Sequence, residues 1–312
     1  MTRLLGNIPF SVGDLLYLLL ILFLFYRIYF VRRSWKADKA SVINNLFKGL
    51  TLFFVLFTIC WGFNYYRTPL YERLAIENTY STEELVLVTH KLVNQVNALH
   101  SQYAENDSAI INVSLPDHII IEQAANGYQE LALAVPEFTY KNTSIKSSLF
   151  SLPLTYMGFG GYINPFTNEA QVNNRMPKTS LFVTASHEIA HQVGIGPEAE
   201  ANFVGYWAAT KNTNAYFDYA AASFALRYCL SRYPFKNEAD FKAFLKNINP
   251  GVLQDWQRNK EFWEAHESFI DTFFKFIYDK FLKVNQQEFG ITGYSKFLDL
   301  LIQHELNKKG CE

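Results

Sequence analysis

Two histidines four residues apart are the clearest chemical signal in this chain of 312 residues. They belong to the HExxH segment His187-Glu188-Ile189-Ala190-His191. Residues at this spacing lie on one face of an α-helix, so both imidazoles can reach one metal ion. Together with a carboxylate they would fill three positions of a tetrahedral Zn²⁺ and leave the fourth for water, whose pKa the ion lowers toward neutrality. Glu188 would then be the general base that takes a proton from this water.

A glycine-rich break follows the second histidine. Either Gly194 or Gly196 can take the left-handed conformation that ends a helix, and Pro197 suits the first position of a new one. We therefore expect two short helices that meet at the metal.

The third ligand has two candidates on the second of these helices, Glu198 and Glu200. Because each residue of an α-helix turns by about 100°, the two side chains point about 200° apart and only one of them can face the ion. Glu198 is the preferred ligand, since Asn202 lies one turn further along the same face and could hydrogen-bond a ligand from outside. Glu200 stays as the alternative.

This stretch resembles the gluzincin metallopeptidases, in which HExxH is followed by a glutamate four residues before Asn or Asp. Glu198-Ala-Glu-Ala-Asn202-Phe is similar to the second motif of several gluzincins. The resemblance implies that His187, His191 and Glu198 bind zinc and that Glu188 is the catalytic acid/base. Two departures concern the third ligand: the segment between His191 and Glu198 is shorter than usual, and many gluzincins have Asp where Asn202 stands.

Over nearly its whole length the chain also resembles a bacterial family of unknown function, in which two membrane helices precede an HExxH domain. The shared motifs are Asn64-Tyr-Tyr-Arg67, Pro165-Phe-Thr-Asn-Glu-Ala170 and the stretch around HExxH. This resemblance implies an architecture and a membrane location, but no substrate.

Two apolar runs near the N-terminus predict a transmembrane hairpin over residues 1–68, with spans at about 12–31 and 49–66. No small-residue cleavage site follows the first run, so it is not expected to be a removable signal peptide. Trp61, Tyr65 and Tyr66 would lie at the membrane interface. The lipid bilayer is therefore an expected partner.

Basic residues predict the orientation of the hairpin. Only Arg3 precedes the first run, whereas several arginines and lysines lie in or beside the connecting loop, namely Arg27, Arg32, Arg33, Lys36, Lys39 and Lys48. Loops rich in Lys and Arg remain in the cytoplasm, so residues 69–312 are expected on the periplasmic side of a bacterial inner membrane. The formal net charge of −1 gives no basic field for a nucleic acid.

Residues 69–312 predict a mainly α domain, zincin-like, with a small antiparallel β ribbon. Ser147 to Asn174, rich in glycine and β-branched residues, should form two or three short strands around a turn at Asn164–Asn168. This ribbon is the expected shelf for an extended peptide. Helices are expected from Ser81, over Pro116–Leu133, and over Tyr216–Tyr233, Glu238–Leu245, Val252–Phe262, His266–Phe281 and Tyr294–Leu306.

Further residues have side chains that could take part in the chemistry. Tyr219, Arg227 and His266 are possible donors to an oxyanion, although a structural role is the more common one for such residues. His304-Glu305 begins like the HExxH segment but has Lys308 where the second histidine should stand, which indicates a surface pair.

The sequence thus predicts a membrane-anchored zinc metallopeptidase that acts on a protein or peptide near the membrane. Two alternatives remain open: a zinc amidase acting on cell-envelope material, and a non-catalytic binding or scaffold protein with a structural or vestigial metal site.

Overall fold

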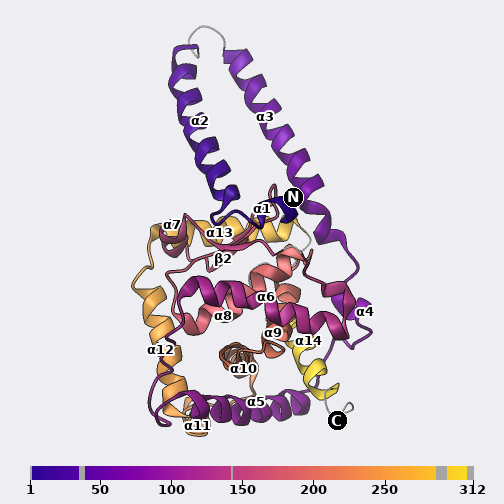
Figure 1. The fold of residues 1–312 in the computed structure, drawn as a ribbon, viewed down its shortest axis with the longest axis vertical. Coiled ribbons are helices and arrows are strands. Elements are labelled where there is room, and N and C mark those ends of the chain that lie inside the picture. The colour runs from indigo at the N-terminus through magenta and orange to yellow at the C-terminus, as the bar shows by residue number, and fades with distance from the viewer. Residues whose placement is uncertain (1, 35–38, 142, 286–293, 308–312) are drawn as a thin grey trace.

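The computed structural model describes residues 2–34, 39–141, 143–285 and 294–307. In this part of the chain, two long helices project side by side from a helical body that contains one small sheet (Figure 1). This is the mainly α architecture that the sequence predicts. The helices are α1 Thr2–Leu5, α2 Val12–Ser34, α3 Lys39–Cys60, η1 Gly62–Tyr66, α4 Leu70–Arg73, α5 Thr82–Tyr103, α6 Asp117–Ala134, η2 Pro136–Phe138, α7 Ser151–Tyr156, α8 Lys178–Gln192, α9 Glu198–Thr210, α10 Ala215–Arg232, α11 Glu238–Leu245, α12 Pro250–Glu264, α13 Phe269–Val284 and α14 Tyr294–Asn307.

The two projecting helices, α2 and α3, are long and apolar enough to cross a membrane. Their apolar side chains are almost all exposed, so neither is the core helix of a soluble fold. The second helix differs from its predicted span, since it begins at Lys39 rather than at residue 49 and ends at Cys60 rather than at residue 66. Its end is earlier because Trp61 and Gly62 are buried, and the backbone tightens there into η1.

The start of α2 is attached to the body. The backbone N–H of Gly13 donates to the Glu169 carboxylate, which also pairs with Lys146 at 2.6 Å, and this ion pair is buried. A carboxylate is favourable at a helix N-terminus, where N–H groups have no partner inside the helix. Asp14 is also buried and accepts a hydrogen bond from Tyr162. The first candidate span therefore begins inside the body.

The sheet has three short strands in the order β1-β3-β2, where β1 is Ile145–Ser147, β2 is Gly161–Ile163 and β3 is Ala170–Val172. β2 pairs antiparallel with β3, around the predicted turn. β1 pairs parallel with β3, so the sheet is mixed rather than a purely antiparallel ribbon. The short helix α7 interrupts the segment where only strands were expected.

The core of the body surrounds α8, which packs on α6, α9 and α10. Tyr128 of α6 is fully buried and donates to the Ser186 carbonyl of α8 at 2.6 Å. On the other side, Gly205 of α9 lies against α8, where an added Cβ would stand 2.8 Å from the His187 Cα. The two helices can approach this closely because position 205 has no side chain. This packing fixes α9 relative to the HExxH segment.

Helix α13 is amphipathic and lies across the base of the hairpin (Figure 1). One face packs inward, with the Phe281 ring 5.8 Å from Phe57 of α3. The other face exposes apolar side chains, among them Phe269, Ile270, Phe273, Phe276 and Ile277. A continuous exposed apolar face of this kind is typical of helices that lie in a membrane interface.

Candidate metal centre

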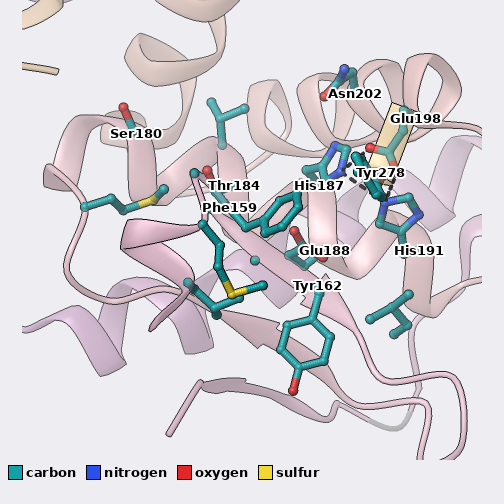
Figure 2. A pocket seen from close by; sticks show the side chains of 18 of the residues that line it. Phe159, Tyr162, Ser180, Thr184, His187, Glu188, His191, Glu198, Asn202 and Tyr278 are labelled. Carbon is teal, nitrogen blue, oxygen red and sulfur yellow. Dashed lines mark hydrogen bonds and ion pairs between the residues drawn. The ribbon is translucent and has the colours of Figure 1, made fainter. Parts of the chain in front are cut away.

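The structure brings His187, His191 and Glu198 together at the junction of α8 and α9. The two Nε2 atoms are 3.1 Å apart. Glu198 Oε2 lies 3.3 Å from Nε2 of His187, and its Oε1 lies 3.4 Å from Nε2 of His191. Figure 2 shows both imidazoles turned toward this carboxylate. In the described part of the chain, this is the one group of three His, Cys, Asp or Glu side chains whose ligand atoms lie within 4.8 Å of one another.

The glycine break between the two helices forms at Gly194, whose φ is +95°. Its N–H donates to the His191 carbonyl at 2.8 Å, and the Ile195 N–H donates to the Ala190 carbonyl, which closes α8. Pro197 directly precedes the first residue of α9. The predicted pair of short helices is confirmed, with Gly194 rather than Gly196 as the left-handed residue.

The Asn64–Arg67 motif packs against this same turn. Arg67 Nη1 donates to the Gly194 carbonyl at 2.8 Å. Gly196 lies against the Asn64 backbone, where an added Cβ would be 2.9 Å from the Asn64 carbonyl carbon. Residues just beyond α3 therefore support the turn that positions the third candidate ligand.

The His191 ring is oriented by its other nitrogen. Nδ1 lies 2.7 Å from the Ile195 carbonyl oxygen, so it carries the proton and donates, which leaves Nε2 free for an ion. The Trp61 ring packs edge-on against this imidazole, with the centroids 5.9 Å apart. Trp61 is only 4% exposed, so the predicted interfacial tryptophan is instead part of the site.

Glu198, and not Glu200, faces the histidines. Glu200 accepts a hydrogen bond from the Leu70 N–H at 2.8 Å, at the start of α4. Asn202 lines the same cavity as the histidines. Because Nδ1 of His187 is buried without a hydrogen-bond partner, Asn202 does not bond to that ring, and its role as a supporting residue stays a prediction.

Glu188 is buried beside the candidate ligands, and its Oε2 has no hydrogen-bond partner. β2 approaches it closely, since a Cβ added to Gly161 would lie 2.6 Å from Glu188 Oε1. Burial raises the pKa of Glu188 to about 7, although the nearby His187 and His191 oppose this rise. A carboxyl group with such a pKa can both take up and release a proton near neutrality.

The histidines and Glu198 shift one another's pKa in the metal-free site. Burial favours the neutral His191 ring, but the Glu198 carboxylate outweighs it and raises the pKa of His191 to about 9. Burial likewise opposes ionisation of Glu198, and the two imidazoles nevertheless hold its pKa well below the usual range. The site therefore combines a carboxylate with a ring that holds a proton where an ion would bind.

A cavity of about 1190 Å³ opens on the three candidate ligands and Glu188. Of the three possible oxyanion donors, Arg227 lines this cavity. Tyr219 instead donates to Asp255 at 2.8 Å, and the His266 ring bonds to the Phe262 carbonyl.

Tyr278 and Tyr65 were not predicted to lie at the site. The Tyr278 hydroxyl donates to Glu198 Oε1 at 2.6 Å, from the inner face of α13. Tyr65 of η1 lines the same cavity and accepts a hydrogen bond from the Trp61 indole at 3.3 Å. The Asn64–Arg67 motif was the available signal for Tyr65, whereas nothing near Tyr278 in the sequence distinguishes it from other helical tyrosines.

The second His-Glu pair is not the predicted surface pair. Glu305 is 1% exposed, pairs with Lys91 at 2.8 Å and accepts from the Tyr206 hydroxyl. The His304 ring packs on Trp207, with the centroids 4.5 Å apart. Both residues therefore belong to the contact between α14 and the core.

These features define a mainly helical protein with two candidate membrane spans and a His/His/Glu group that could hold a metal ion. The chain belongs to the family described as "Protein of unknown function (DUF3810)", whose family model matches residues 1–302. The predicted membership in a family of unknown function is thereby confirmed. No curated protein and no solved structure matches the chain.

Proposed function

We propose that the protein is a membrane-anchored, zinc-dependent metallopeptidase. The observation that carries this proposal is the close approach of the two Nε2 atoms and the Glu198 carboxylate. A tetrahedral zinc with ligand bonds of about 2.0–2.1 Å separates its ligand atoms by about 3.3 Å. The two Nε2 atoms are 3.1 Å apart, Glu198 Oε2 lies 3.3 Å from Nε2 of His187, and Glu198 Oε1 lies 3.4 Å from Nε2 of His191. Each imidazole thus meets a different oxygen of the carboxylate, and one ligand atom from each of the three residues lies within 4.8 Å of the others.

The chemistry of the donors also fits a cation. In its neutral form, with the proton on Nδ1, His191 turns an Nε2 lone pair toward the Nε2 of His187 and the Glu198 carboxylate. Electron-rich atoms at this distance repel one another unless a proton or a cation lies between them. When bound, the ion would polarise a water molecule and the carbonyl group of the substrate.

Glu188 would move the protons of the reaction. Its unpartnered Oε2 and its pKa of about 7 suit a group that takes a proton from water and later gives it up. In the hydrolysis, the water oxygen bonds to the carbonyl carbon and the C–N bond breaks. Glu188 delivers the proton to the departing nitrogen.

The edge strand β2 supports a peptide as the substrate. β2 has only one neighbour in the sheet, and its residues line the cavity. An exposed strand edge can hold an extended peptide by backbone hydrogen bonds. At Gly161 the strand lies against Glu188, so a peptide paired there would run past the candidate base.

The location is part of the same proposal. The start of α2 and the residues that follow α3 both pack on the body, so the body lies at this end of the two helices, while Ser34 and Lys39 lie at their far ends (Figure 1). Basic residues gather around that loop, which favours a cytoplasmic loop and a periplasmic body at a bacterial inner membrane.

The decisive experiment compares the full chain with its Glu188→Gln variant, both purified in detergent. Metal analysis should find one zinc per chain in both proteins, because Glu188 is not a ligand. Hydrolysis of a pool of quenched-fluorescence peptides should be lost only in the variant. Absence of stoichiometric metal would contradict the proposal. Equal activity of both proteins would favour a non-catalytic scaffold, and cleavage of cell-envelope material alone would favour the amidase.

A further inference from the structure

The cavity at the candidate metal centre extends along the first candidate span. Four residues of α2 line it: Tyr17, Leu20, Ile21 and Leu24. Their spacing of three, four and seven residues places them on one stripe of the helix. With a rise of 1.5 Å per residue, this stripe covers about 10 Å along the helix axis. The cavity thus runs from the candidate ligands into the segment expected to lie in the bilayer.

The second candidate span contributes the opposite wall. Phe57 of α3 lines the cavity together with Trp61 and Tyr65, which follow that helix. Trp61 contacts the His191 ring, so an apolar wall continues from α3 to a candidate ligand. Phe281 of α13 packs on Phe57 and Tyr65 and closes this wall on the side of the body.

The membrane end of the cavity suits only apolar material. Leu20, Ile21 and Leu24 are 43%, 43% and 49% exposed although they line a cavity. Apolar side chains that are this exposed in a membrane span are stabilised when hydrocarbon covers them. The bilayer around α2 and α3 is a direct source of such a chain.

The lining that α8, α10 and α12 contribute is mixed. It includes the polar side chains Ser180, Arg227, Asp255 and Asn259 beside apolar ones such as Val183 and Phe224. Ser180 donates to Asn259 at 2.8 Å. A molecule that fills the whole cavity would therefore meet polar groups as well as the apolar stripe of α2.

The length of the apolar stripe favours an acyl chain over a membrane-spanning helix. Its residues Tyr17 to Leu24 cover about 10 Å along the axis of α2, whereas a transmembrane helix is about 30 Å long. The cavity lining on α2 therefore matches a hydrocarbon chain in length and favours it over a second membrane-spanning polypeptide.

We propose that the substrate is a membrane-resident N-acyl amide, whose hydrocarbon chain lies along the α2 stripe while its amide group lies at Glu188. This inference rests on the proposed metal-dependent hydrolysis of a C–N bond at Glu188, and it assigns that bond to the amide of an acyl chain instead of an internal peptide bond. The acyl carbonyl carbon receives the water oxygen, the C–N bond breaks, and the products are a fatty acid and an amine.

Alkyl hydroxamates test this arrangement, since the hydroxamate group binds zinc and the chain occupies the adjacent space. The full chain is reconstituted in phosphatidylcholine nanodiscs and titrated with acetohydroxamate and dodecanohydroxamate. Each methylene that leaves water improves binding by about fourfold, so the longer probe should bind at least about 100-fold more tightly.

Matched variants separate binding in the cavity from simple partition into the bilayer. Leu20→Trp and Leu24→Trp fill the α2 stripe and should reduce the preference for the longer probe. Leu19→Trp and Leu22→Trp introduce the same side chain at positions that are 54% and 55% exposed and outside the cavity lining, so they should leave the preference unchanged.

The outcomes distinguish the two proposals. If acetohydroxamate does not bind, or binds equally well after His187→Ala, the metal centre itself fails. If acetohydroxamate binds but all four tryptophan variants keep the same chain-length preference, the acyl-chain inference is overturned and the metallohydrolase remains. Release of dodecanoate from an N-dodecanoyl peptide or from N-dodecanoyl phosphatidylethanolamine would support the inference and identify the source of the chain. Release from the lipid alone would at the same time favour the amidase over the peptidase. Cleavage of a transmembrane peptide without chain-length preference would overturn it.

Discussion

Glu198 and Glu200 are two residues apart on α9, yet they have different surroundings. Glu198 faces two imidazoles and accepts a hydrogen bond from Tyr278. Glu200 is turned away and accepts from the Leu70 N–H at the start of α4. Replacing either glutamate by glutamine is therefore the same chemical change, made inside the candidate metal centre at Glu198 and outside it at Glu200.

We expect Glu198→Gln to lower zinc affinity by more than the roughly 10–100-fold that loss of an outer partner costs a metal site. Glu200→Gln should keep wild-type affinity, because its carboxylate does not face the histidines. Competition with a chromophoric chelator measures the zinc dissociation constants of both variants. The reverse order of effects would assign the third ligand to Glu200.

Protonation of His191 should make metal binding dependent on pH. Without metal, its pKa is raised to about 9, so near pH 7 the ring carries a proton that zinc must displace. Zinc affinity should therefore rise by about tenfold per pH unit up to about pH 9 and then level off.

The same proton affects the stability of the metal-free fold. The charged His191–Glu198 pair contributes its full stabilisation below about pH 6.5, and this contribution is lost as the pH rises through about 9.

Isothermal titration calorimetry in two buffers with different ionisation enthalpies counts the released protons. About one proton per zinc is expected from His191 at pH 7 and almost none well above pH 9. A heat that does not depend on the buffer at pH 7 would contradict the assignment of His191 as a ligand.

Four elements converge on the candidate centre: α8 and α9 supply the ligands, η1 supports the turn between them, and α13 covers Glu198. Each contact depends on close packing rather than on the motif alone. Gly205 makes one such contact with the backbone of α8, because an added Cβ would stand 2.8 Å from both the Cα and the backbone nitrogen of His187.

Gly205→Ala should push α9 away from α8 and separate Glu198 from the histidines. Overpacking of this kind costs about 1–3 kcal/mol of folding free energy, and the metal site should weaken with it. Gly49→Ala is the matched control, since an added Cβ meets nothing within 4 Å there. Thermal unfolding and zinc content measure the two effects. If both variants have the same unfolding temperature and the same zinc content, the contact between α8 and α9 is not needed for the site.

Across the whole molecule, sequence patterns correctly predicted the features that depend on residues close together in the sequence. The HExxH spacing, the glycine turn and the preference for Glu198 all lie within one short stretch, and the structure brings these side chains together. Contacts between distant segments were not predictable from one sequence. Tyr278 meets Glu198 across 80 positions, and Gly13 meets Glu169 across 156. The burial of Glu305 was predicted wrongly for the same reason, since its partners Lys91 and Tyr206 belong to other helices.

The orientation of the hairpin is the remaining prediction, and it decides which compartment supplies the substrate. Cys60, Cys229 and Cys311 are replaced by serine, and one cysteine is introduced either at Lys39, at the start of α3, or at exposed Lys242 of α11. In spheroplasts, a membrane-impermeant maleimide should label position 242 and spare position 39, because the basic loop stays in the cytoplasm. Lysis should expose both positions. Labelling of position 39 alone before lysis would place the candidate metal centre in the cytoplasm.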